Sequence, residues 1–170
     1  WAQTPAIIPI PVKSEYPTGK YLLPKSIIIA APKDEALKTA FKTLETKLSN
    51  LGGRKIQWIQ PASTATALAN IRLQINSTAN AELGKEGYNI LVDTKGVQIQ
   101  ANSAKGLFYG IQTFYQLLPK EVESASPVAI ATISVPFAKI TDYPRFEWRG
   151  MMFDVARHFF TKDEVKKFID

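Results

Sequence analysis

The stretch YNILVDTKGVQIQANSAKGLFYGIQTFYQLLP, residues 88–119, decides the fold. Its first part holds two short apolar runs, 88–93 and 97–101, and the residues Thr94-Lys95-Gly96 between them predict a hairpin with glycine at the turn. Its second part predicts a helix that Pro119 closes. One face of this helix would carry Leu107, Ile111, Phe114 and Leu118. The stretch therefore predicts two antiparallel strands followed by an amphipathic helix.

Another helix and more strands precede this stretch. The β-branched run 26–30 predicts a strand, and so do residues 55–60 and 70–76. Between the first two of these strands, apolar residues recur with helical spacing, and Gly52-Gly53 end the helix. The apolar positions are Leu37, Phe41, Leu44, Leu48 and Leu51.

Downstream of the stretch, residues 120–132 have the composition of a loop and 133–142 that of one more strand. The middle strands are joined by short connections, which predicts that they are antiparallel. The expected fold class is α+β, a mostly antiparallel sheet with two helices on one face.

Two glycines, Gly106 and Gly110, lie inside the second predicted helix, where each costs about 1 kcal/mol relative to alanine. Their spacing puts both on one face, which predicts close packing of the helix against the sheet or a neighbouring domain. A phosphate-binding loop is not indicated, because the helix begins before the glycines and no strand–GxG turn precedes it.

Composition excludes several classes of site. The chain of 170 residues carries a formal charge of +6, but its lysines are interspersed with acidic residues, which indicates a solvated basic surface rather than a nucleic-acid site. There is no cysteine and a single histidine, so neither disulfides nor a zinc site is expected. No apolar run approaches the roughly 20 residues that span a bilayer. We expect no cofactor, no metal, no nucleic-acid partner and no membrane span.

A second stretch, EWRGMMFDVARHFF at 147–160, places Asp154, Arg157 and the only histidine, His158, in an otherwise apolar segment. On the residues alone, Arg157 reads as a structural ion-pair partner and His158 as a packing residue. In an extended strand Asp154 and Arg157 would point to opposite sides, so direct pairing requires the strand to end between them. Thr161 and Glu164 are expected to form a helix capping box, and the acids Asp163 and Glu164 to complement the helix dipole.

Several motifs resemble glycoside hydrolase family 20, the β-N-acetylhexosaminidases. The helix KGLFYGIQTFYQLLP, residues 105–119, is similar to that of the domain preceding the family's catalytic barrel, and the hairpin before it is also similar. YPRFEWRGMMFDVARHFF, residues 143–160, resembles the family's first barrel strand, P-R-F-x-x-R-G-x-x-x-D-x-x-R-H-F. The resemblance covers essentially the whole chain.

The resemblance implies two parts: residues 1–143 as an α+β domain of the chitobiase/hexosaminidase domain 2 type, and 144–170 as the first strand and helix of a truncated (β/α)₈ barrel. It implies that Arg157 binds the terminal sugar of an amino-sugar glycan, N-acetylglucosamine or N-acetylgalactosamine, with Asp154 and His158 as supporting residues. The family's catalytic Asp-Glu pair is absent from these residues, so we expect the chain alone to be inactive. The Pro-rich start at Trp1 suits an exported, periplasmic or secreted, protein.

The alternative is a stand-alone carbohydrate- or protein-binding module, which would need exposed, coplanar aromatic side chains. Trp58, Tyr88, Phe108 and Tyr115 occupy core-type positions, which disfavours it. Without neighbouring barrel strands, a strand at 149–154 would have unpaired edges, and the apolar side chains of the barrel piece, Phe153 among them, would face water. We therefore expect residues 146–170 either to be disordered or to be buried against a second copy of the chain, by self-association.

Overall fold

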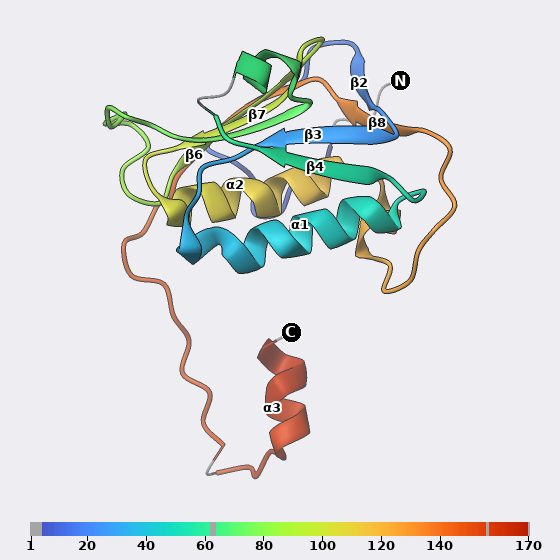
Figure 1. Cartoon of the computed structure of the whole chain (residues 1–170). Coiled ribbons are helices and arrows are strands. Elements are labelled where there is room, and N and C mark those ends of the chain that lie inside the picture. The colour runs from blue at the N-terminus through green and yellow to red at the C-terminus, as the bar shows by residue number, and fades with distance from the viewer. Residues whose placement is uncertain (1–4, 62–63, 156, 170) are drawn as a thin grey trace.

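The computed structural model describes residues 5–61, 64–155 and 157–169, and Figure 1 shows the course of the chain. The strands are β1 (Lys13–Glu15), β2 (Lys20–Leu23), β3 (Ser26–Ala30), β4 (Lys55–Ile59), β5 (Ile71–Ile75), β6 (Tyr88–Asp93), β7 (Gly96–Ala101), β8 (Ile133–Pro136) and β9 (Ala138–Asp142). The α-helices are α1 (Lys38–Asn50), α2 (Ala104–Leu117) and α3 (Lys162–Ile169). Short 3₁₀ turns are η1 (Glu35–Leu37), η2 (Thr64–Leu68) and η3 (Lys120–Glu123), the last within the predicted loop.

Seven strands form one mixed sheet in the order β1-β9-β6-β7-β5-β3-β4. The pairings from β1 to β7 are antiparallel, and β6 and β7 form the predicted hairpin, with Gly96 at φ 118°. The pairings of β7 with β5, β5 with β3 and β3 with β4 are parallel. The prediction of a mostly antiparallel sheet is therefore wrong for half of this sheet.

The parallel half arises because strands consecutive in the sequence are not neighbours in the sheet. The chain passes from β3 through α1 to β4, and β5 then pairs with the other side of β3, with Ile29 opposite Ile71. A short connection implies an antiparallel pair only when it joins adjacent strands. Asn70, just before β5, connects β3 and β7 by hydrogen bonds. The Ile28 N–H of β3 donates to the Asn70 side-chain oxygen at 2.8 Å, and the Val97 N–H of β7 donates to the Asn70 carbonyl at 2.9 Å.

The predicted strand 133–142 is divided at Phe137. β9 joins the main sheet, whereas β8 pairs with β2 in a separate two-stranded sheet. The Phe137 N–H donates to the Gly19 carbonyl at 3.0 Å, which holds the corner between the two sheets. One run of alternating residues thus serves two sheets, a change of partner that periodicity alone does not reveal.

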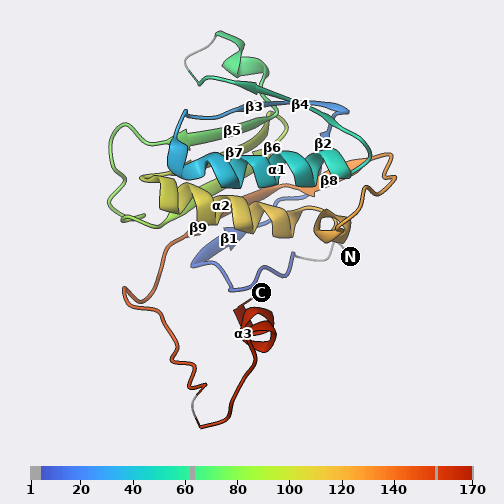
Figure 2. The same cartoon turned by 60° about the horizontal axis from the view of Figure 1, so that its bottom comes forward.

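The helices α1 and α2 lie side by side on one face of the main sheet (Figures 1 and 2). Their inward faces and the sheet form the core, which includes the fully buried Ile27, Leu44, Leu48, Ile71, Ile99, Leu107, Ile111 and Phe114. Burying each large apolar side chain stabilises the fold by about 1.5–3 kcal/mol. The end of α1 is as predicted, with Gly52 and Gly53 at φ 70° and 63°.

The glycines of α2 allow the helix to approach the sheet closely. A Cβ atom at Gly106 would overlap the Gly87 carbonyl oxygen, and one at Gly110 would overlap the Ile99 side chain. The prediction of close packing is confirmed.

A buried polar network fixes the end of β9, where the chain leaves this domain. The Tyr88 hydroxyl lies 2.6 Å from the Thr113 hydroxyl and donates to the Asp142 carboxylate at 3.0 Å. The other Asp142 oxygen accepts from the Val12 N–H at 3.1 Å. Burial raises the pKa of Tyr88, so the phenol stays protonated and continues to donate. The network ties β6, α2 and β9 together at the exit point.

Among the described residues, no helix is long and apolar enough to cross a membrane.

Candidate functional site

The segment that carries the candidate site residues leaves the first domain after β9, and its described residues form no helix or strand before α3 (Figure 1). The predicted strand at 149–154 is not formed. A β-strand is held by hydrogen bonds to a neighbouring strand, and none of the described strands pairs with this segment. The helix predicted to follow it is formed, as α3.

Asp154 and Arg157 lie together in this segment. The Arg157 Nε atom is 3.6 Å from the Asp154 Oδ2 atom, and the Arg157 N–H donates to Oδ1 at 3.4 Å. Their pairing was expected to require a strand that ends between the two residues, but the described residues on either side of position 156 form no strand. The Arg157 side chain is 89% exposed, and His158 is also exposed. A planar, permanently charged guanidinium in this position can present paired donors to two neighbouring hydroxyl groups.

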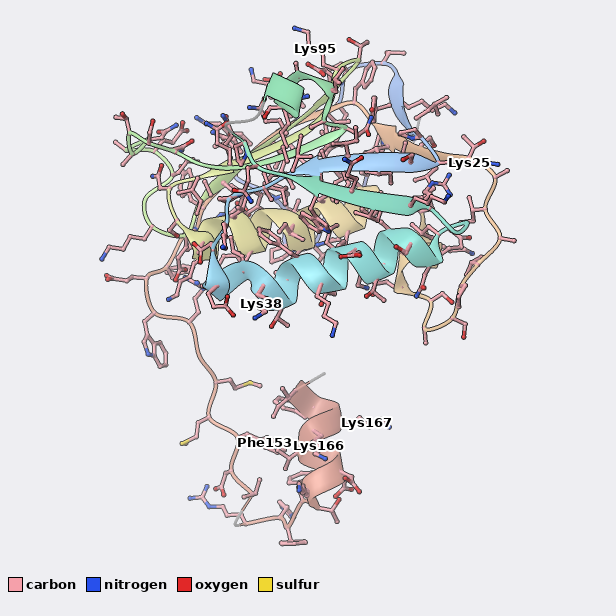
Figure 3. The ribbon with its side chains drawn as sticks, viewed as in Figure 1. Lys25, Lys38, Lys95, Phe153, Lys166 and Lys167 are labelled. Carbon is pink, nitrogen blue, oxygen red and sulfur yellow. The ribbon has the colours of Figure 1, made fainter. Side chains whose placement is uncertain are left out.

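The helix α3 is anchored to the same segment by aromatic contacts. The Phe153 ring, which faces α3 in Figure 3, stacks on Phe168 with centroids 4.6 Å apart and an interplanar angle of 5°. Phe160 packs against Phe153 at 4.9 Å. The segment and α3 therefore form a small hairpin-like unit around Phe153.

Thr161 and Glu164 form the predicted capping box at the start of α3. The Thr161 N–H donates to the Glu164 carboxylate at 2.7 Å, and the Glu164 N–H donates back to the Thr161 hydroxyl at 3.4 Å. The hydrogen bond from the Thr161 backbone, then the one from its side chain, holds the pKa of Glu164 below its usual range. Glu164 is engaged as a capping anion and is not a proton donor awaiting a substrate.

Two family models match the chain in succession. "Glycosyl hydrolase family 20, domain 2" matches residues 4–143, and "Glycosyl hydrolase family 20, catalytic domain" matches 146–170. The chain belongs to glycosyl hydrolase family 20. It is thus related to glycoside hydrolases, but it includes only a small part of the catalytic domain.

Relatives and solved structures agree with the family. The chain is 36% identical over 164 residues to a "Beta-hexosaminidase" of Porphyromonas gingivalis, covering 96% of this chain and 20% of that protein. It is 32% identical over 165 residues to a "Beta-N-acetylhexosaminidase" of Cellulomonas fimi, covering 96% and 31%. The β-N-acetylhexosaminidase structure from Streptomyces coelicolor aligns with a TM-score of 0.75 at 33% identity, covering 96% of this chain and 31% of that one. The chain spans between a fifth and a third of the length of these proteins.

The segment matched by the catalytic-domain model, residues 146–170, exposes many large apolar side chains. They are Phe146, Trp148, Met151, Met152, Val155, Phe159, Phe160, Phe168 and Ile169. Phe153 was expected among them, but it is partly buried because it stacks on Phe168. An apolar surface of this kind is typical of an interaction site.

A second cluster of charged residues, which the sequence did not indicate, lies where this segment leaves the first domain. The Arg149 guanidinium pairs with the Glu86 carboxylate, and Lys105 Nζ lies 3.5 Å from the same carboxylate. The hydrogen bond with Arg149 is the main cause that lowers the pKa of Glu86. Glu86 and Arg149 border a groove of about 370 Å³, which is lined by residues 81–86 and by residues of the connector 143–149. Glu86 and Arg149 lie 63 positions apart in the sequence, so no local pattern links them.

The four aromatic residues proposed as core positions are not all buried. Tyr88 and Tyr115 are buried, and Trp58 is partly buried between Phe41, at 5.2 Å between ring centroids, and the Glu45 carboxylate, which accepts from its indole N–H at 3.0 Å. Phe108 was wrongly predicted to be buried: it is 41% exposed, because it lies on the outer face of α2. It meets Tyr109 edge-on rather than in a shared plane, so the two do not form a flat platform for a sugar ring.

Within the described ranges, no group of three or more His, Cys, Asp or Glu side chains is placed to hold a metal ion.

Proposed function

We propose that this chain is the N-terminal portion of a β-N-acetylhexosaminidase that removes terminal N-acetylglucosamine or N-acetylgalactosamine from glycans or chitin oligomers. The observation that carries the proposal is the succession of the two family 20 matches, with the D-x-x-R-H-F residues at 154–159 inside the second. On this proposal residues 1–143 are the supporting α+β domain and 144–170 begin the catalytic barrel. An exported location remains a prediction.

In the proposed reaction Arg157 binds the non-reducing sugar. Its guanidinium donates paired hydrogen bonds to two adjacent ring hydroxyls, which fixes the sugar without taking part in bond breaking. Asp154 supports it, since its carboxylate lies beside the guanidinium in this chain. His158 is assigned a supporting role from its place next to Arg157.

The chemical steps require a carboxylate pair that residues 1–170 do not contain. A glutamic acid donates its proton to the glycosidic oxygen as the bond to the anomeric carbon breaks. The substrate's own acetamido oxygen attacks that carbon, an aspartate orients the acetamide, and water then opens the cyclic intermediate with retention of configuration. This substrate-assisted route differs from the usual retaining mechanism, in which an enzyme carboxylate is the nucleophile.

We expect the 170-residue chain to show no hexosaminidase turnover, because it lacks both the acid and most of the barrel that would hold the sugar. A chromogenic N-acetylglucosaminide is the substrate, and an enzyme with the complete catalytic domain is the positive control. Turnover that copurifies with the 170-residue chain through two different columns would contradict the proposal.

We also propose that the chain self-associates through residues 146–170. Burying the exposed apolar side chains of this segment against a second copy would stabilise the assembly by about 25 cal/mol for each Å² of apolar surface removed from water. Size-exclusion chromatography with light scattering should show a mass that rises with concentration, and a chain ending at Tyr143 should remain a monomer. A mass of the 170-residue chain that stays at its monomer value across the concentration range would refute the self-association.

A further inference from the structure

Arg149 joins the connector, residues 143–149, to the first domain. Its guanidinium pairs with Glu86, which precedes β6, and also donates to the Phe146 carbonyl within the connector at 2.8 Å. Glu86 first, and the Tyr109 hydroxyl of α2 after it, hold the pKa of Arg149 above its ordinary value. One side chain therefore contacts the loop before β6, helix α2 and the connector itself.

The partner of Arg149 is held by a rigid frame. The loop that carries Glu86 is fastened to the start of α2: the Ser103 hydroxyl donates to the Lys85 carbonyl at 2.5 Å, and the Asn102 side-chain amide donates to the carbonyls of Asn80 and Gly84 at 2.7 and 2.8 Å. The close approach of Gly106 to the Gly87 carbonyl adds a packing contact. Glu86 thus moves with α2 and the sheet rather than with the connector.

The pair is also shielded more than a typical surface ion pair. The Glu86 side chain is 23% exposed and that of Arg149 43%, whereas the Lys13–Glu82 pair in the same region is 66% and 42% exposed. Exposed pairs contribute little because water screens them, and partial burial with several hydrogen bonds increases the contribution. The Arg149–Glu86 pair is therefore expected to hold its two segments together more strongly than a fully exposed pair would. The Lys13–Glu82 pair serves as the matched comparison.

We propose that Arg149 is a positioning residue: its pair with Glu86 fixes the direction in which the connector leaves the first domain, and thereby the place of Arg157, eight residues further on. The effect on Arg157 rests on the proposed function. The fixed direction of the connector does not, because it depends only on contacts within this chain.

Distance measurements by pulsed electron paramagnetic resonance test the fixed direction. The chain has no native cysteine, so spin labels can be placed on Gln57→Cys, exposed on β4, and on Met151→Cys, exposed just after the connector. Because residues 146–170 are proposed to self-associate, the labelled chain is diluted with an excess of unlabelled chain, so that only the distance within one chain is measured. We expect a narrow distribution that at least doubles in width in Glu86→Gln and in Arg149→Met. The double variant Glu86→Arg with Arg149→Glu should narrow it again, and Glu82→Gln should leave it unchanged.

A broad distribution in the unsubstituted chain would overturn the proposal, and so would unchanged widths in both Glu86→Gln and Arg149→Met. Equal broadening in Glu82→Gln would also overturn the proposal, because it would show that loss of any nearby carboxylate charge broadens the distribution. Far-UV circular dichroism checks that each variant is folded. Arg149→Met removes the pair from the connector side, so it tests the pair even where Glu86→Gln alters the first domain.

Activity of an enzyme that carries these residues with a complete catalytic domain tests the effect on Arg157. Misplacing a substrate-binding group lowers kcat/KM on the order of tenfold to a hundredfold, so Arg149→Met should lose that much and the exchanged pair should recover most of it. A broadened distance with unchanged kcat/KM would overturn the link to Arg157. Failure of the unsubstituted enzyme to hydrolyse N-acetylhexosaminides would instead contradict the proposed function, and the distance result would stand separately.

Discussion

Replacing Gly106 with valine should destabilise the chain by about 3 kcal/mol, because overpacking a close contact costs typically 1–3 kcal/mol and more where the neighbour is immobile. The Cβ atom would overlap the Gly87 carbonyl oxygen, and it would lie 3.0 Å from the Ala101 Cβ atom. Both neighbours belong to the backbone or lie next to it, so a rotamer change cannot relieve the contact. Urea unfolding followed by far-UV circular dichroism measures the loss of unfolding free energy.

Two further variants make the Gly106 result decisive. Gln112→Val introduces the same residue at an exposed position of the same helix, so it reports the effect of helix propensity without the contact. Gly106→Ala should also destabilise, although alanine is favoured over glycine in a helix by about 1 kcal/mol. A higher urea midpoint for Gly106→Ala would mean that α2 has room to move away from the loop before β6.

The sequence predicted the elements of the first domain better than their arrangement. Hydrophobic periodicity identified α1 and α2, glycine marked the turn of the hairpin, and the Gly106–Gly110 spacing indicated close packing, because all of these depend on neighbours in the sequence. The parallel pairing of β3, β4 and β5 depends on which strands become neighbours in space. Asn70 helps to decide that by bonding β3 and β7 at once, a role with no local signal.

The candidate site shows the same limit. The capping box at Thr161 could be predicted, since its partners are three residues apart. Periodicity could not show whether residues 149–154 form a strand, because a strand forms only where a partner strand lies beside it. The pair of Glu86 and Arg149 was missed because an ion pair between residues 63 positions apart leaves no periodic signal.

Replacing Arg157 with lysine should lower kcat/KM about tenfold to a hundredfold in an enzyme that carries this chain and a complete catalytic domain. Arginine offers parallel N–H donors in a fixed plane, whereas lysine is a point charge on a flexible stem. The exchange loses at least one hydrogen bond from a charged group, worth about 1.5–3 kcal/mol. Steady-state kinetics on a chromogenic N-acetylglucosaminide give kcat and KM separately.

Arg145→Lys is the matched control for Arg157→Lys, because it makes the same chemical change at an exposed arginine of the same segment, outside the proposed sugar contact. We expect it to leave kcat/KM close to that of the unsubstituted enzyme. Arg157→Met should lower kcat/KM further than Arg157→Lys, since it removes the charge and every donor. If Arg157→Lys retains kcat/KM within twofold while the enzyme remains folded, Arg157 does not contact the sugar, and its pairing with Asp154 would then be a structural contact of the segment alone.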